Sequence, residues 1–154
     1  MQISLNKQSR LYLSAKQREV ITDIAIYLFV ILFMYTAAGK LLAIKSFAST
    51  LAKSPLIGSY NLFVAWAIPI IEIIIGLLLI IPPVKKMGLY AALFLMTVFT
   101  LYLIYMVFSG SKLPCHCGGV ISSMTWQQHI WFNLGFIALA ITGLAINKNK
   151  EFIH

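Results

Sequence analysis

The stretch LFVAWAIPIIEIIIGLLLIIPPVKKMGLYAALFLMTVFTLYLIYMVF, residues 62–108, decides the fold class. It holds two apolar runs, 62–81 and 87–108, separated by a turn with two prolines and two lysines. Glu72 is the only charged residue inside either run. A helix needs roughly 17–25 apolar residues to cross a bilayer. Because backbone polar groups in lipid must be satisfied internally, runs of this length are predicted to be transmembrane helices.

Two more apolar runs, at about 21–38 and 129–146, bring the number of predicted spans to four. The chain is only 10% charged, whereas a soluble domain carries about 25% charged residues. This composition predicts an all-α, polytopic membrane protein, a four-transmembrane-helix bundle. We expect one membrane domain over 21–146, a cytoplasmic arm at 1–20 and a cytoplasmic tail at 147–154. The polar segment before the first run is too long for a signal peptide, so we interpret that run as an uncleaved helix.

The basic residues predict how the spans are oriented. One side of a four-span bundle would carry eight of them: Lys7, Arg10, Lys16, Arg18, Lys85, Lys86, Lys148 and Lys150. The other side would carry four: Lys40, Lys45, Lys53 and Lys112. Since cytoplasmic loops are enriched in Lys and Arg, both termini are predicted to be cytoplasmic. We expect a bacterial inner-membrane protein whose first and third loops face the periplasm. Topology and contact with anionic lipid account for the net charge of +8, so no nucleic-acid partner is predicted.

The segment GKLLAIKSFASTLAKSPLIGSYN, residues 39–61, follows the first span. Its apolar residues recur at helical spacing, with lysines between them, which predicts an amphipathic segment on the outer membrane surface. The apolar positions are Leu41, Leu42, Phe47 and Leu51. Pro55 and Gly58 are expected to turn the chain into the second span.

Glu72 lies near the middle of the second span, where an ionised carboxylate is costly and should face the bundle. Helical spacing places it on a small, polar stripe, the kind of face that packs against another helix in lipid. The stripe is Ala65, Pro69, Glu72, Gly76 and Leu79. Its candidate partners are Lys40, His129 or a tyrosine hydroxyl. Glu72 is interpreted either as a proton carrier or anchor for a redox site, or as a structural, hydrogen-bonded side chain.

His129 and Asn133 lie four residues apart at the start of the fourth span and share a face with Trp126 and Phe136. Here His129 could tune a thiolate, carry a proton or bind a metal. The alternative is an interfacial histidine beside Trp126 and Trp131, in the aromatic belt of the membrane surface.

The loop before the fourth span contains PCHCGG, residues 114–119, with both cysteines of the chain. Extended residues two apart have Cα atoms about 6.6–7.2 Å apart, and a disulfide needs about 4.4–6.8 Å. A bridge between Cys115 and Cys117 therefore requires a bent backbone, which Gly118 and Gly119 permit. Such a bond would be strained and redox-active, and a protonated His116 would favour the thiolate. The motif thus indicates a dithiol/disulfide switch.

A metal site is the rival interpretation of this loop. Cys115, His116, Cys117 and His129 could supply ligands for Cu(I) or Zn(II). However, adjacent side chains rarely close on one ion, and zinc sites usually place two to four residues between cysteines. We therefore favour the redox interpretation.

Four stretches together resemble the MauE/DoxX-like family of bacterial four-helix integral membrane proteins. They are YTAAGKLLAIKSFASTLAKSPLI, AIPIIEIIIGLLLIIP, GLYAALFLMTVFTLYLIYM and CHCGGVISSMTWQQHIWFN, and the resemblance extends over about 33–143. The name member is associated with maturation of a disulfide-rich periplasmic dehydrogenase, beside a thioredoxin-like partner. The resemblance therefore implies membrane thiol–disulfide chemistry at Cys115 and Cys117. The form CHCGG, in place of Cys-x-Cys-Phe-Gly, leaves the substrate open.

Two classes of function follow. The first is a thiol–disulfide redox protein, possessing one cysteine pair and exchanging electrons with a periplasmic thioredoxin-like protein or with quinone. The DoxX branch of the family is linked to a thiosulfate:quinone oxidoreductase, although no arginine lies within the spans to hold a quinone. The second is a non-catalytic subunit of a membrane complex, in which the cysteines are structural.

Overall fold

The computed structural model describes residues 14–109 and 125–148. Within these ranges every regular element is helical, and four helices are long and apolar enough to cross a membrane. The all-α, four-span prediction is therefore confirmed. The elements in chain order are α1 (Ala15–Leu42), α2 (Ile44–Ala52), the short 3-10 helix η1 (Gly58–Tyr60), α3 (Asn61–Ile80), the 3-10 helix η2 (Pro82–Val84), α4 (Lys85–Phe108) and α5 (Trp126–Lys148).

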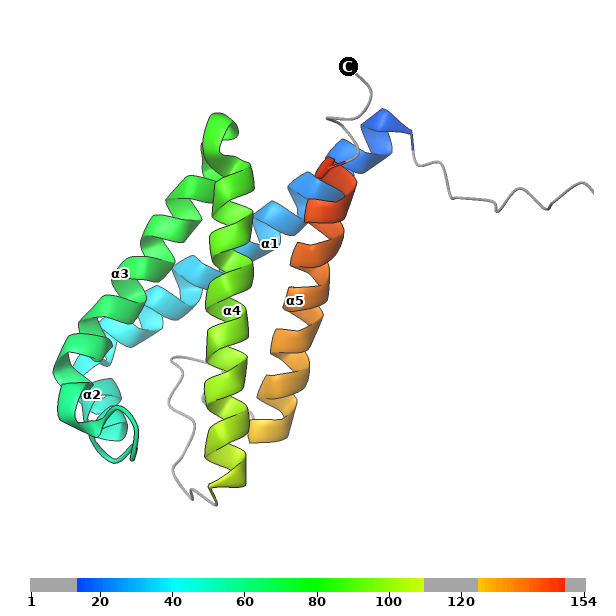
Figure 1. Ribbon diagram of the computed structural model, residues 1–154. Helices are drawn as coiled ribbons and strands as arrows, with labels where there is room; N and C mark the ends of the chain where they lie inside the picture. The colour runs from blue at the N-terminus through cyan, green and yellow to red at the C-terminus, as the bar shows by residue number, and fades with distance from the viewer. Residues whose placement is uncertain (1–13, 110–124, 149–154) are drawn as a thin grey trace, which may run out of the picture.

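The four long helices form a closed ring of contacts. Helix α1 packs on α3, α3 on α4, α4 on α5, and α5 on α1. Successive helices run in opposite directions, and α1 crosses behind the others at a steep tilt (Figure 1). Helix α2, the start of α3, the end of α4 and the start of α5 all lie toward one end of the bundle, lowest in Figure 1. We call this the α2 end, and the site described below lies toward it.

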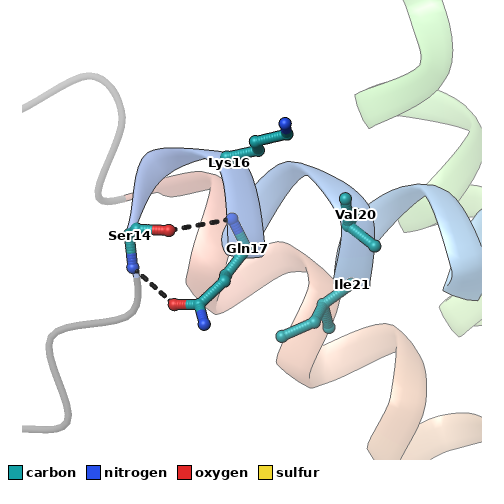
Figure 2. Close-up of a pocket in the computed structure, with 5 residues that line it drawn as sticks. All are labelled: Ser14, Lys16, Gln17, Val20 and Ile21. Carbon is teal, nitrogen blue, oxygen red and sulfur yellow. Dashed lines mark hydrogen bonds between the residues drawn. The ribbon is translucent and has the colours of Figure 1, made fainter.

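Helix α1 begins with a capping box at the end of the bundle opposite the α2 end. The Ser14 hydroxyl accepts a hydrogen bond from the Gln17 backbone N–H at 3.3 Å, and the Gln17 side chain accepts one from the Ser14 N–H at 2.9 Å. These reciprocal bonds satisfy two backbone groups that a helix start leaves unpaired. Figure 2 shows these bonds beside Lys16, Val20 and Ile21, which together with Ser14 and Gln17 line an open hollow.

The amphipathic segment after the first span is α2, and its packing corrects one part of the prediction. The spacing of Phe47 and Leu51 predicted an apolar face on the outer membrane surface; in the structure Phe47, Ala48 and Leu51 are buried and pack on α3. Leu42, in contrast, is 90% exposed. It was counted among the apolar positions of the segment, but α1 continues through Leu42 and the helix breaks only at Ala43. Leu42 therefore does not follow the helical register of α2.

Helices α3 and α4 form a tight hairpin around the two prolines of η2. Gly88 is buried where α4 passes the end of α3. A Cβ atom at this position would lie 2.9 Å from the Leu79 backbone nitrogen and 3.0 Å from the Leu78 carbonyl carbon. Because backbone atoms cannot move aside as a flexible side chain does, the hairpin needs glycine here.

A single apolar cluster fills the middle of the bundle and draws on all four long helices. Its buried members are Ile26, Phe29, Phe33, Ile75, Leu79, Leu89, Ala92, Met96 and Ala140. Large apolar side chains also cover the outside, including Tyr27, Phe63 and Phe94. In a soluble protein so much exposed apolar surface would cause aggregation. In a multi-pass membrane protein it is the surface that contacts lipid.

The structure corrects the assignment of Lys40 to a loop. The predicted first span ended at residue 38, but α1 runs through Leu42 and Lys40 is only 2% exposed. The number of basic residues counted for the two sides of the membrane is therefore eight and three, not eight and four. The asymmetry keeps its direction, and the orientation of the termini stays a prediction. Lys40 instead belongs to the bundle interior, where it has a specific partner.

Candidate functional site

A buried ion pair joins α1 to α3. Lys40 Nζ lies 2.7 Å from Glu72 Oε1 and 3.1 Å from Oε2, so the ammonium donates to both carboxylate oxygens. Glu72 is 7% exposed. Of the three candidate partners predicted for Glu72, the structure selects Lys40. Opposite charges in contact, with hydrogen bonds between them, are the arrangement that makes two charges tolerable in an apolar interior.

The predicted stripe on α3 is what brings the two charges together. All five of its members, Ala65, Pro69, Glu72, Gly76 and Leu79, are buried. Gly76 lies against the end of the Met34 side chain on α1, so the two helices approach closely beside the ion pair. Small residues that let helix backbones approach are the usual means of packing helices in lipid. The assignment of this face from helical spacing is confirmed.

Thr36 belongs to the same site, although the sequence did not single it out. It precedes Lys40 by one helical turn, is buried, and places its hydroxyl beside the Glu72 carboxylate. That hydroxyl also lies 3.3 Å from the Phe33 carbonyl oxygen, to which it donates. The spacing Thr36-x-x-x-Lys40 was the available signal, and it carries meaning only once Lys40 is known to lie inside the bundle.

His129 and Asn133 form a second buried polar group, on α5. His129 is 4% exposed and Asn133 is 2% exposed, whereas Trp131 on the opposite face is 74% exposed. The His129 ring lies 5.7 Å from the Phe99 ring of α4, measured between centroids. The His129 side chain is thus turned into the bundle and away from Trp131, and both its functional role and the interfacial alternative stay predictions. Phe136, predicted to share this face, packs edge-on against Phe29 of α1 at 5.2 Å.

The Asn133 side chain is notable for what it does not contact. Its Nδ2 atom is buried and has no hydrogen-bond partner among the residues that the structure describes. Buried amide groups are nearly always hydrogen-bonded, so each exception calls for an explanation.

A further polar contact ties α4 to the turn after α2. The Tyr102 hydroxyl donates to the Ser54 hydroxyl at 3.1 Å, and Ser54 is itself buried. Asn61 at the start of α3 donates to the Ala48 carbonyl of α2 at 3.2 Å. These two bonds fasten α2 to the bundle next to the start of α3.

Cys115, His116 and Cys117 lie outside the described residues, so their predicted roles stay predictions. Of the alternative metal ligands, only His129 lies within the described ranges. Across 14–109 and 125–148 no three His, Cys, Asp or Glu side chains gather closely enough to hold a metal ion. The helices on either side of the cysteine segment are described, and α4 ends and α5 begins at the α2 end.

Comparison with known protein families gives a match over most of the chain. The family model described as "Methylamine utilisation protein MauE" matches residues 18–146, which include all of α3 and α4, α1 without its first three residues and α5 without its last two. No curated protein and no solved structure matches the chain significantly.

Proposed function

Because this chain belongs to the MauE family of membrane proteins, we propose that it is a membrane thiol–disulfide redox protein. Cys115 and Cys117 would form its reactive pair and exchange electrons with a periplasmic thioredoxin-like protein or with quinone. The protein would lie in the bacterial inner membrane with both termini in the cytoplasm. Lipid surrounds the bundle in any case, since its outer surface is apolar.

One observation carries the proposal. In the sequence the cysteine pair falls between Phe108, where α4 ends, and Trp126, where α5 begins, and both of these helix ends lie at the α2 end. The start of α5 carries His129, a buried histidine within the first turns. Thiol–disulfide exchange needs a thiolate, and a neighbouring base or positive charge favours it. This is why a redox role is preferred over a purely structural one.

Glu72, Lys40, His116, His129 and Asn133 are proposed as supporting residues. Oxidation of a dithiol releases two protons, which have to be carried from the thiols to the group that accepts them. Glu72 and His129 are the side chains of the described bundle that can accept a proton there, and both are buried. Lys40 would hold the Glu72 carboxylate in place between proton transfers, through its two hydrogen bonds.

Trapping of an intermediate tests the proposal. Exchange passes through a mixed disulfide, which accumulates when the resolving thiol is missing. We expect Cys115→Ser or Cys117→Ser to give a band of higher mass on non-reducing gels, removed by dithiothreitol and containing a thioredoxin-like protein. The double Cys115→Ser/Cys117→Ser variant is the control and should give no such band.

Two outcomes would contradict the redox proposal. If neither single variant forms the adduct and the purified wild type binds one equivalent of copper or zinc through its thiols, the protein is a metal-binding membrane protein. If the double cysteine variant keeps full function in cells, the cysteines are structural and the chain is a non-catalytic subunit of a membrane complex.

A further inference from the structure

Asn133 is a buried hydrogen-bond donor that has no partner among residues 14–109 and 125–148 of this membrane protein. Its side chain is almost completely buried, and its Nδ2 hydrogens meet no acceptor in the described part of the chain. Neither water nor another polar solvent is present in the bilayer core to compensate, so an unsatisfied amide is costly there. An apolar residue of similar size, such as leucine, would avoid this cost. A donor kept at such a position points to a ligand that supplies the acceptor.

The surroundings of Asn133 define what such a ligand would look like. His129, Phe132 and Phe136 follow one another on the same face of α5, and the Phe99 ring of α4 packs against His129. Phe132 and Phe136 lie 4.9 Å apart between ring centroids. Aromatic rings favour a flat ligand, because stacked or edge-on ring pairs are attractive at such distances. The aromatic residues carry no charge, which favours an uncharged ligand.

The position of this face also determines how a ligand would reach it. Phe99 and Phe132 are only half-buried, so the face opens partly to the outside of the bundle. Asn133 lies two turns into α5, a helix apolar enough to span the membrane, and the outside at this depth is lipid. A ligand would therefore arrive from the bilayer, and it has to be soluble in lipid.

We propose that Asn133, together with His129 and Phe99, binds the head group of a membrane quinone. A quinone is flat, uncharged and lipid-soluble, and its carbonyl oxygens accept hydrogen bonds. The Asn133 amide would donate to one carbonyl oxygen, and the aromatic side chains would pack against the ring. This inference rests on the proposed redox function, for which it names the electron acceptor.

The transfer of electrons from the cysteine pair to the quinone balances in electrons and protons. The Cys115 and Cys117 thiols lose two S–H bonds and form one S–S bond, giving up two electrons and two protons. The quinone takes up both electrons and both protons at its two oxygens and becomes a hydroquinone. A hydrogen bond from Asn133 stabilises negative charge that develops on the carbonyl oxygen as electrons arrive.

Binding of decylubiquinone to the purified full-length protein in detergent micelles tests the proposal. We expect saturable quenching of tryptophan fluorescence by the quinone in the wild type, and Asn133→Leu should weaken binding by about five- to tenfold. Without quinone, Asn133→Leu should have an equal or higher Tm, since it removes an unpartnered amide. Gln127→Leu is the matched control, an exposed amide on the same helix, and should bind quinone as the wild type does.

The outcomes separate this inference from the redox proposal. The double variant Cys115→Ser/Cys117→Ser should still bind quinone, so loss of thiol cycling with intact quinone binding would overturn the redox function alone. Absence of saturable binding by the wild type, or equal binding by Asn133→Leu, would overturn the quinone site and leave a protein partner as the electron acceptor. A marked fall in Tm for quinone-free Asn133→Leu would show that the amide has a partner within the protein, which also contradicts the site.

Discussion

Lys40 and Glu72 are two opposite charges held against each other inside an apolar bundle. In an interior of low dielectric constant, each charge compensates for the other. The pair adds little to the stability of the fold compared with two well-packed apolar side chains, because both charges lose their hydration when they are buried. The strong effect is expected when one partner is removed alone, since the remaining charge is then buried without compensation.

The stability of single and double variants checks this argument. We expect Lys40→Met to lower the free energy of unfolding by about 3–5 kcal/mol. The double variant Lys40→Met/Glu72→Leu should stay near the wild type, since it replaces both charges by apolar groups of similar size. Thermal unfolding of the purified proteins in micelles measures both. An equally large loss in the double variant would mean that the helices depend on the pair itself.

The same residues allow a functional role to be separated from packing. If Glu72 carries protons, Glu72→Gln and the stable double variant should both show impaired cycling of Cys115 and Cys117, and the double variant should do so without the buried, uncompensated Lys40 that Glu72→Gln leaves behind. The ratio of reduced to oxidised thiols, measured by maleimide trapping in intact cells, gives this readout. Cycling at the wild-type rate in both variants would make Glu72 structural.

The sequence predicted the α3 side of the site but not the position of Lys40 or the unpartnered amide of Asn133, and each difference has a physical reason. The buried face of α3 follows from helical spacing alone, so Glu72 and its neighbours were assigned correctly. Lys40 was named as one possible partner but counted among loop residues, because a lysine at the end of an apolar run usually reaches out to the membrane surface. The unpartnered amide of Asn133 could not be predicted, because it depends on which acceptors the neighbouring helices bring close.

Helices α3 and α4 form a hairpin whose close approach depends on one glycine. Gly88 has no room for a side chain, since the backbone of Leu78 and Leu79 lies directly against it. The apolar runs predicted both helices and the turn between them. They did not predict this close approach, because hydrophobicity determines the length of a span and not its distance from a neighbour.

A pair of alanine substitutions tests how tightly this hairpin is packed. Gly88→Ala should lower the Tm by several degrees and reduce the yield of folded protein, since the backbones of α3 and α4 must separate to admit a methyl group. Gly135→Ala on α5 is the matched control, because a Cβ atom there has nothing within 4 Å. It should be neutral or slightly stabilising, as alanine favours the helix. Equal Tm values for the two variants would contradict the tight hairpin.

For the whole molecule, the number of spans and their order along the chain were predictable, since each apolar run became one long helix. Their orientation in the membrane was predicted from eight basic residues on one side against four on the other, and it stays a prediction. The steep tilt of α1 was not predictable, because it results from the way α1 packs across α3 and α5.

Labelling of single cysteines in intact cells tests the orientation. With the α2 end in the periplasm, the Cys117→Ser variant should react at Cys115 with a membrane-impermeant maleimide after mild reduction and without lysis of the inner membrane. For the opposite end, Pro83→Cys in a Cys115→Ser/Cys117→Ser background places a thiol at the exposed η2 turn. It should be labelled only after lysis. The reverse pattern would invert the topology.

The ion pair also bears on how the chain enters the membrane during synthesis. Inserting a helix with one charged residue near its centre costs about 2.5–3.5 kcal/mol, and the helix carrying Glu72 emerges from the ribosome after the one carrying Lys40. Glu72 can pair with Lys40 during insertion only if α1 is still at the translocon when α3 enters it. We therefore expect the two helices to leave the insertion machinery together. A nascent chain whose first helix has already diffused away would retain a lone carboxylate in lipid, a defect that membrane quality-control proteases could recognise.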